Sequence, residues 1–196
     1  MKQQININKP LKIGFDLDGV LLYNPARVFR PITLAVKYLI NPEKVCKTHF
    51  YYPKTTLEQL IWRLVHLSSF KMAKGLDEIK QLVEDGKIEA YIVTSRYDCL
   101  KGDFTWWIKR MNAKRYFKGV FHNKNNMQPH LFKVKKLKEL KLDYFVEDNW
   151  DIVSNITKQT NTTGLWITNN LDKGISYPHK FMSLKDAVNF IKQLKH

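Results

Sequence analysis

The feature that most constrains this chain is a short apolar run, Leu11 to Phe15, that ends in Asp16-Leu17-Asp18-Gly19. An apolar run closed by acidic residues and glycine is typical of a buried strand that stops at a turn. Two carboxylates, those of Asp16 and Asp18, are therefore expected where a strand ends.

Strand-like and helix-like segments alternate along the rest of the chain. Apolar residues at helical spacing predict helices at 31–40, 55–67, 76–84, 104–111, 133–140, 152–158 and 184–194. Runs of β-favouring residues predict further strands at 89–93, 117–121, 144–146 and 164–167. This alternation predicts an α/β fold, a Rossmann-like, doubly wound parallel sheet with helices on both faces.

The spacing of the polar segments also predicts an insertion. About 75 residues separate Gly19 from Thr94, which is more than one α/β connection needs. We expect a small α-helical cap at residues 24–75, inserted after the first strand. Residues 1–23 and 76–196 then form the α/β core domain.

Composition limits the class of protein. A chain of 196 residues that is 44% hydrophobic can bury a core. Its apolar stretches are too short to span a bilayer, and its polar N-terminus lacks the apolar centre of a secretory signal. Two cysteines, Cys46 and Cys99, are too few for a disulfide framework or a cysteine zinc site. We expect a cytoplasmic protein without a membrane partner.

The chain is strongly basic, with a formal net charge of +15. Such a charge attracts polyanions and steers phosphorylated substrates. The lysines are spread along the chain and form no single block, which favours a solvated surface over a nucleic-acid site. A small phosphorylated substrate is the expected partner, nucleic acid is the less favoured one, and the oligomeric state is open.

Three predicted strands end in polar clusters. These are Asp16 with Asp18, Thr94 with Ser95, and Glu147 with Asp148. Any one cluster is explained by turn chemistry. Ligands of open α/β sheets, however, bind beyond the carboxyl ends of the strands, so the three clusters together predict one site.

These residues resemble the haloacid dehalogenase (HAD) superfamily. Gly14 to Val20, Ile92 to Arg96 and Phe145 to Asn149 are similar to its first, second and fourth motifs, and the resemblance extends from Lys12 to Ile167. It implies a Mg²⁺-dependent phosphomonoester hydrolase with an aspartyl-phosphate intermediate and a C1-type cap. Within the family the chain is most similar to the C-type 5'(3')-deoxyribonucleotidase-like group, which implies a nucleotide or another small phosphometabolite as substrate.

The resemblance also implies roles for the acids. Asp16 is expected to be the nucleophile, because an ionised carboxylate attacks phosphorus without activation. Asp18 is expected to protonate the leaving oxygen and later to take a proton from water. The expected Mg²⁺ ligands are Asp16, the backbone carbonyl of Asp18, and Asp148. Glu147 is expected to support the ion through water, and its direct ligation is left open.

Phosphate binding is assigned to a hydroxyl pair and a lysine. Thr94 is expected to donate its hydroxyl to the phosphoryl oxygens, and Ser95 to share that task. Lys133 is the best match for the lysine of the third motif because it opens the helix before the strand that carries the last acid pair. Lys135 and Lys136 compete for this role.

The sequence is also compatible with two other functions. The charge allows a phosphatase that acts on nucleic-acid ends, and the same scaffold can also serve a non-catalytic binding protein. Five residues are candidates to line the cap, although Trp or His on a helix more often belongs to a core. They are Arg27, Arg30, Trp62, Arg63 and His66.

Overall fold

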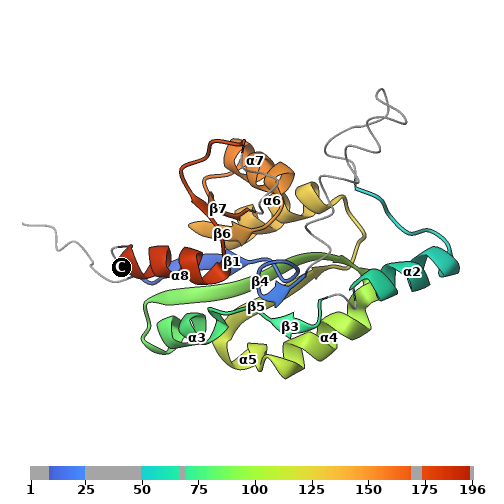
Figure 1. The fold of residues 1–196 in the computed structure, drawn as a ribbon, viewed down its shortest axis with the longest axis horizontal. Coiled ribbons are helices and arrows are strands. Elements are labelled where there is room, and N and C mark those ends of the chain that lie inside the picture. Colours follow the sequence, from blue (N-terminus) through green and yellow to red (C-terminus); the bar gives the residue numbers. More distant parts are fainter. Residues whose placement is uncertain (1–8, 25–49, 67–68, 169–173, 195–196) are drawn as a thin grey trace, which may run out of the picture.

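A six-stranded parallel sheet forms the centre of the molecule (Figure 1). The structure, a computed structural model, describes residues 9–24, 50–66, 69–168 and 174–194. The strands of the sheet, in spatial order, are β5 (Phe117–Asn123), β4 (Ile88–Tyr97), β1 (Leu11–Phe15), β6 (Tyr144–Glu147), β7 (Thr163–Ile167) and β8 (Lys180–Phe181). Strand β1 lies between β4 and β6, so that Phe15 is level with both Ile92 and Val146.

Helices cover both faces of this sheet, which confirms the predicted fold class. The helices are α2 (Thr56–His66), α3 (Leu76–Glu84), α4 (Lys101–Arg110), α5 (Ala113–Tyr116), α6 (Pro129–Leu140), α7 (Trp150–Gln159) and α8 (Leu184–Gln193), with a short 3-10 helix, η3 (Asp98–Leu100), before α4. Figure 1 shows α6 and α7 on one side of the sheet and α3, α4 and α5 on the other. Within the described ranges, no helix has the length and apolar character needed to cross a membrane.

Strand β4 shows how the sheet divides the core into two layers. Ala90 and Ile92 pack with α3, α4, α5 and α8 on one face. Tyr91 and Val93 point to the other face and pack with α6 and α7. A parallel strand that is buried on both faces needs apolar residues on both of them, and this is why residues 90–93 of β4 are all apolar.

Local side-chain caps set the start of several helices. Thr55 and Glu58 form a reciprocal capping box before α2, in which Glu58 N donates to Thr55 Oγ1 (3.2 Å) and Thr55 N donates to Glu58 Oε2 (2.9 Å). Asn149 caps α7 by accepting from the backbone N of Asp151. Ser183 caps α8 in the same way.

Strands β4 and β8 and helix α6 are among the elements that differ from the sequence predictions. Strand β4 continues to Tyr97, beyond the predicted end at 93, because Tyr97 still pairs with Asn123 of β5. Helix α6 begins at Pro129, where a proline suits the first turn, so Lys133 lies in its second turn and does not open it. Strand β8 was not predicted, since two residues are too few to show a period.

A two-stranded ribbon joins the chain just before the predicted cap to residues 71–72, which lie inside its predicted range of 24–75. Strand β2 (Leu22–Tyr23) pairs antiparallel with β3 (Lys71–Met72), which brings the two ends of the intervening stretch together. The predicted helix at 31–40 lies outside the described residues, as does most of the predicted cap. Helix α2 matches the predicted helix at 55–67. Its apolar side chains are nevertheless exposed, namely Leu57, Leu60, Ile61 and Leu64.

Gly14 allows β1 and β6 to approach each other, and a side chain there is expected to destabilise the fold. A Cβ atom at Gly14 would lie 2.5 Å from Leu142 Cδ1 and 2.7 Å from Phe145 Cδ2. We expect Gly14→Ala to lower the free energy of unfolding by about 1–3 kcal/mol through overpacking. Gly102→Ala in α4, where nothing lies within 4 Å, should raise it by up to about 1 kcal/mol. Urea unfolding measures both, and equal stability of Gly14→Ala and the wild type would contradict the close packing.

Candidate active site

The loop after β1 is held in one conformation by backbone hydrogen bonds. Leu22 N donates to Leu17 O (2.8 Å), and Gly19 N donates to Leu22 O (2.8 Å). The side chains of Leu17 and Leu22 are buried in the core beneath the loop. These hydrogen bonds therefore fix the backbone positions of Asp16 and Asp18, which flank Leu17.

Gly19 brings this loop against the end of β6. Its φ of +77° lies in the left-handed region, and a Cβ atom there would lie 2.2 Å from Asp148 Oδ2. Only glycine tolerates both the conformation and the contact. The first and last acid clusters predicted from the sequence are thus in direct contact.

A buried lysine joins these two clusters. Lys133 Nζ lies 2.9 Å from Asp16 Oδ2 and 2.5 Å from Glu147 Oε2, and the side chain of Lys133 is 1% exposed. Its competitors point elsewhere, because Lys135 is exposed and Lys136 pairs with Glu139. Lys133 is therefore the lysine of α6 that contacts the acids.

The acid cluster is suited to a divalent cation. Asp16, Glu147 and Asp148 each offer an oxygen, and these oxygens lie within 4.8 Å of one another. Asp16 Oδ1 is buried and has no hydrogen-bond partner in the described part of the chain. Three ionised carboxylates facing the single ammonium of Lys133 leave two negative charges, which one Mg²⁺ would cancel.

Glu147 is already bound by protein groups on both of its oxygens. Its Oε2 accepts from Lys133, and its Oε1 accepts from the backbone N of Asn149 (3.0 Å). Asp16 and Asp148 are consequently the better candidates for direct metal ligands. The supporting role expected for Glu147 stays a prediction.

The start of α7 positions Asp148. Asn149 is the N-cap of α7, and the indole Nε1 of Trp166 donates to Asp148 O (3.3 Å). The partial positive charge at a helix N-terminus favours nearby anions. The end of β6 and the start of α7 therefore help to hold the acids in place.

Burial shifts the pKa of two of the acids. Burial raises the pKa of Asp16, Lys133 partly opposes this, and the nearby charges of Asp148 and Asp18 raise it further. Burial also raises the pKa of Glu147 to about 8, again against the opposing effect of Lys133. These carboxyl groups hold protons more tightly than usual, and a bound cation would compete with those protons.

The predicted phosphate-binding hydroxyls lie on β4. Thr94 is buried, and its Oγ1 accepts from the backbone N of Arg96 (3.3 Å), so its own hydroxyl hydrogen is free to donate. Ser95 Oγ is buried without a hydrogen-bond partner among the described residues. Because Phe15 is level with Ile92, Thr94 lies at the same edge of the sheet as the loop that carries Asp16.

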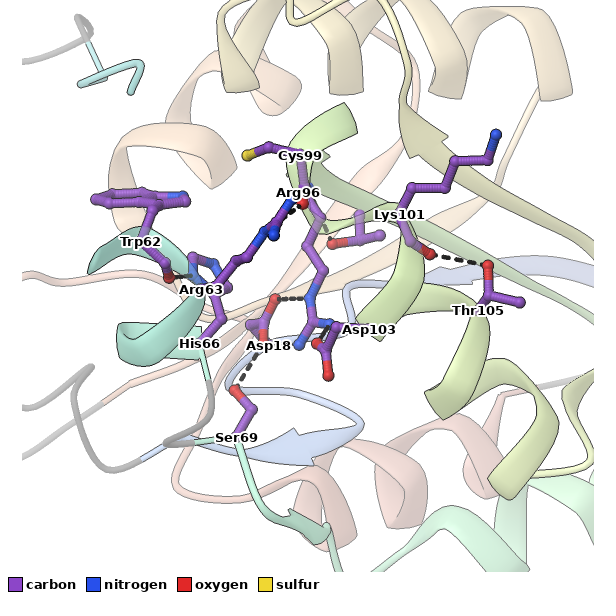
Figure 2. A network of polar contacts seen from close by, with 11 residues as sticks. Asp18, Trp62, Arg63, His66, Ser69, Arg96, Cys99, Lys101, Asp103 and Thr105 are labelled. Atoms are coloured by element: carbon purple, nitrogen blue, oxygen red, sulfur yellow. Dashed lines mark hydrogen bonds and ion pairs between the residues drawn. The ribbon is translucent and has the colours of Figure 1, made fainter. Parts of the chain in front are cut away.

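The side chain of Asp18 has different partners from those of Asp16 (Figure 2). Arg96 Nε donates to Asp18 Oδ2 (2.8 Å), Arg96 Nη2 donates to Oδ1 (2.7 Å), and Ser69 Oγ donates to Oδ1 (2.7 Å). Burial alone would raise the pKa of Asp18, but the charge and hydrogen bonds of Arg96 outweigh it and hold that pKa well below its usual range. Arg96 also pairs with Asp103 of α4.

Neither Arg96 nor Ser69 was given a role from the sequence. An arginine inside a buried strand requires an acidic partner, but the predicted strand ended at 93, so the sequence did not show that Arg96 is buried. The identity of that partner depends on the fold, since Asp18 and Arg96 are 78 positions apart. The backbone carbonyl of Asp18 remains a predicted metal ligand.

No protein-family model and no curated protein sequence matches the chain. Solved structures do. A putative β-phosphoglucomutase from Thermotoga maritima has a TM-score of 0.58 at 16% identity, over 94% of this chain and 99% of that one. A HAD hydrolase of family IA, variant 3, from Entamoeba histolytica has a TM-score of 0.57 at 13% identity, over 93% of this chain and 100% of that one. A HAD-superfamily hydrolase from Ehrlichia chaffeensis has a TM-score of 0.51 at 15% identity, over 95% of this chain and 98% of that one.

The chain has the fold of HAD-superfamily hydrolases. At these identities the likeness establishes shared architecture. It confirms the predicted Rossmann-like sheet, in which Asp16 directly follows β1, the strand between β4 and β6. The predicted C1-type cap and the deoxyribonucleotidase-like grouping stay predictions.

Mg²⁺ is expected to stabilise the protein more at high pH than at low pH. The raised pKa of Glu147 contributes stability to the metal-free protein that is lost as pH rises through about 8. At about pH 6 protons compete with the cation, whereas at about pH 9 they do not, so the rise in melting temperature with Mg²⁺ should be larger at about pH 9.

Matched variants test the site of this effect. Asp148→Asn should abolish the Mg²⁺ response at both pH values, whereas Asp77→Asn, at an exposed position paired with Lys80, should keep it. A Mg²⁺ response that persists in Asp148→Asn would place the ion elsewhere.

Proposed function

We propose that this protein is a Mg²⁺-dependent phosphomonoester hydrolase that forms an aspartyl-phosphate on Asp16. The observation that carries the proposal is the state of the Asp16 carboxylate. Its Oδ2 is bound to the buried ammonium of Lys133, while its Oδ1 is buried in the acid cluster without a hydrogen-bond partner in the described ranges. Such a carboxylate is oriented for attack and lies where a cation can offset the charge of an incoming phosphate.

The first half-reaction transfers the phosphoryl group to the protein. Mg²⁺, held by Asp16 and Asp148, would neutralise charge on the phosphate. Asp16 attacks phosphorus, the bond to the leaving oxygen breaks, and Asp18 supplies the proton that this oxygen takes. The hydroxyl of Thr94 and the ammonium of Lys133 stabilise charge on the transferring oxygens, with Ser95 as a further donor.

The second half-reaction returns the protein to its starting state. A water molecule attacks the phosphorus of phospho-Asp16, and Asp18 accepts the proton that this water loses. The bond between phosphorus and the Asp16 oxygen breaks, and inorganic phosphate leaves. Two carboxylates on one loop thus have separate roles, Asp16 forming the bond to phosphorus and Asp18 carrying the proton.

A nucleotide or another small phosphometabolite is the proposed substrate class. The ring of Trp62 lies 5.9 Å from that of Tyr51 and 5.4 Å from that of His66. His66 is close enough to Asp18 for its charge to lower the pKa of that carboxyl group, after the larger effects of burial and Arg96. Figure 2 shows His66 near Asp18 and Trp62 on the far side of His66. Aromatic rings close to a phosphate site suit a flat base.

The charge of the chain supports one alternative substrate. A net charge of +15 would favour phosphorylated nucleic-acid ends. Release of phosphate from oligonucleotide ends that weakens with added salt, together with no activity on mononucleotides, would favour this alternative. A wild-type protein that binds phosphate esters without turnover would instead favour a non-catalytic role.

Asp16→Asn should abolish Mg²⁺-dependent release of phosphate from an aryl phosphate, because an amide is not a nucleophile for phosphorus. The measurement is initial rate with and without Mg²⁺, with circular dichroism to show that the fold is kept. Asp77→Asn serves as the control and should keep the wild-type rate. Normal turnover in Asp16→Asn would refute the assignment of the nucleophile.

Lys133→Met should reduce activity by about 100- to 1000-fold, because it removes an ammonium that stabilises charge on the phosphate. Methionine keeps an apolar stem and removes only the charged end, whose Nζ lies 5.5 Å from the centre of the Phe145 ring. Lys135→Met, at an exposed position of the same helix, is the matched control and should stay close to wild type. A larger loss in Lys135→Met would move the role to that residue.

A further inference from the structure

Asp18 has one acceptor position left on its carboxylate. Each carboxylate oxygen can accept about two hydrogen bonds. Oδ1 accepts from Arg96 Nη2 and from Ser69 Oγ, whereas Oδ2 accepts from Arg96 Nε alone. The hydrogen bonds in the described part of the chain therefore fix both oxygens and leave Oδ2 able to accept one more.

Arg96 is itself held rigidly from several directions. Its side chain is 1% exposed, Asp103 of α4 binds its Nη1, and its backbone N donates to Thr94 Oγ1. A guanidinium that donates two parallel N–H hydrogen bonds to a carboxylate fixes the orientation of that carboxylate as well as its distance. Figure 2 shows Arg96 between Asp18 and Asp103.

Ser69, from a different part of the chain than Arg96, also binds the Asp18 carboxylate. It lies between α2 and β3, in the stretch that returns from the inserted segment, and it is 2% exposed. Asp18 is thus bound by the core through Arg96 and by the returning stretch through Ser69. Both contacts are made to a carboxylate, which is the form that accepts a proton.

We propose that Arg96 is a positioning residue that holds the Asp18 carboxylate for the hydrolysis of phospho-Asp16. The inference rests on the proposed function. As water oxygen bonds to phosphorus, the water proton goes to Asp18 Oδ2, the bond from phosphorus to the Asp16 oxygen breaks, and its electron pair restores the Asp16 carboxylate. Arg96 touches neither the water nor the phosphate and acts through Asp18.

This role predicts a kinetic signature that a purely structural role lacks. With an aryl phosphate, the leaving group departs without a proton, so the phosphorylation of Asp16 does not need Asp18 as an acid. Loss of Arg96 should slow only the second half-reaction. As a result kcat and KM fall together, kcat/KM is unchanged, and phosphorylated protein accumulates.

The test compares Arg96→Gln with Arg115→Gln in the presence of Mg²⁺ and an aryl phosphate. Arg115 pairs with Glu84 at an exposed position, so it controls for the loss of an arginine ion pair. In Arg96→Gln we expect kcat to fall on the order of 10- to 100-fold with unchanged kcat/KM, and acid quenching to trap hydroxylamine-labile phosphoprotein. Arg96→Lys should have a higher kcat than Arg96→Gln, because lysine restores the positive charge but not the two parallel hydrogen bonds to Asp18.

A second pair of variants keeps the inference testable if Arg96→Gln fails to fold. Asp103→Asn and Ser69→Ala each loosen one contact and should give a smaller fall in kcat, again with unchanged kcat/KM. A raised KM with unchanged kcat would make Arg96 a substrate-binding residue and overturn the proposal, as would wild-type kinetics in Asp103→Asn and Ser69→Ala. A wild type that forms no phosphoprotein and releases no phosphate would refute the proposed function and this inference with it.

Discussion

The buried ammonium of Lys133 is the interaction on which the rest of the site depends. It binds Asp16 after β1 and Glu147 at the end of β6, and it comes from α6, which packs on one face of the sheet. Three carboxylates brought together away from water would repel one another and resist ionisation. The ammonium of Lys133 holds β1, β6 and α6 together at this point. It leaves a residual negative charge on the acids that a metal ion can balance.

The two aspartates of the first loop illustrate how neighbours in sequence acquire different chemistry. Burial raises the pKa of Asp16, whereas Arg96 holds that of Asp18 below its usual range. Leu17 between them points into the core, so the two carboxylates meet different sets of partners. One carboxylate belongs to a cluster of acids around Lys133, and the other shares Arg96 of the sheet with Asp103.

Much of the fold was predictable because its signals are local. The apolar run of β1 and the amphipathic period of α3 gave bounds that the structure reproduces, Leu11–Phe15 and Leu76–Glu84. The convergence of the first and last acid clusters followed from the rule that parallel strands end at one edge. Lys133 was the best match in the sequence, but periodicity could not exclude Lys135 and Lys136, whereas the burial of Lys133 against Asp16 and Glu147 does.

What the sequence could not reveal depends on partners that are distant along the chain. The pairing of Arg96 with Asp18 and Asp103 joins a strand, a loop and a helix, and no short motif encodes it. Strand β8 has two residues and is defined only by its neighbour β7. The extension of β4 through Thr94 and Ser95 likewise reflects β5 as a partner and not the composition of β4 itself.

The ribbon of β2 and β3 has an evolutionary consequence. Leu22 pairs with Met72 and Tyr23 with Lys71, so the chain leaves the core and re-enters it at the same place. Closing a loop costs free energy that grows only slowly with its length. The part of the segment that precedes Ser69 can therefore lengthen, shorten or be exchanged across descendants, while Ser69 keeps its hydrogen bond to Asp18 and the sheet and its acids stay unaltered.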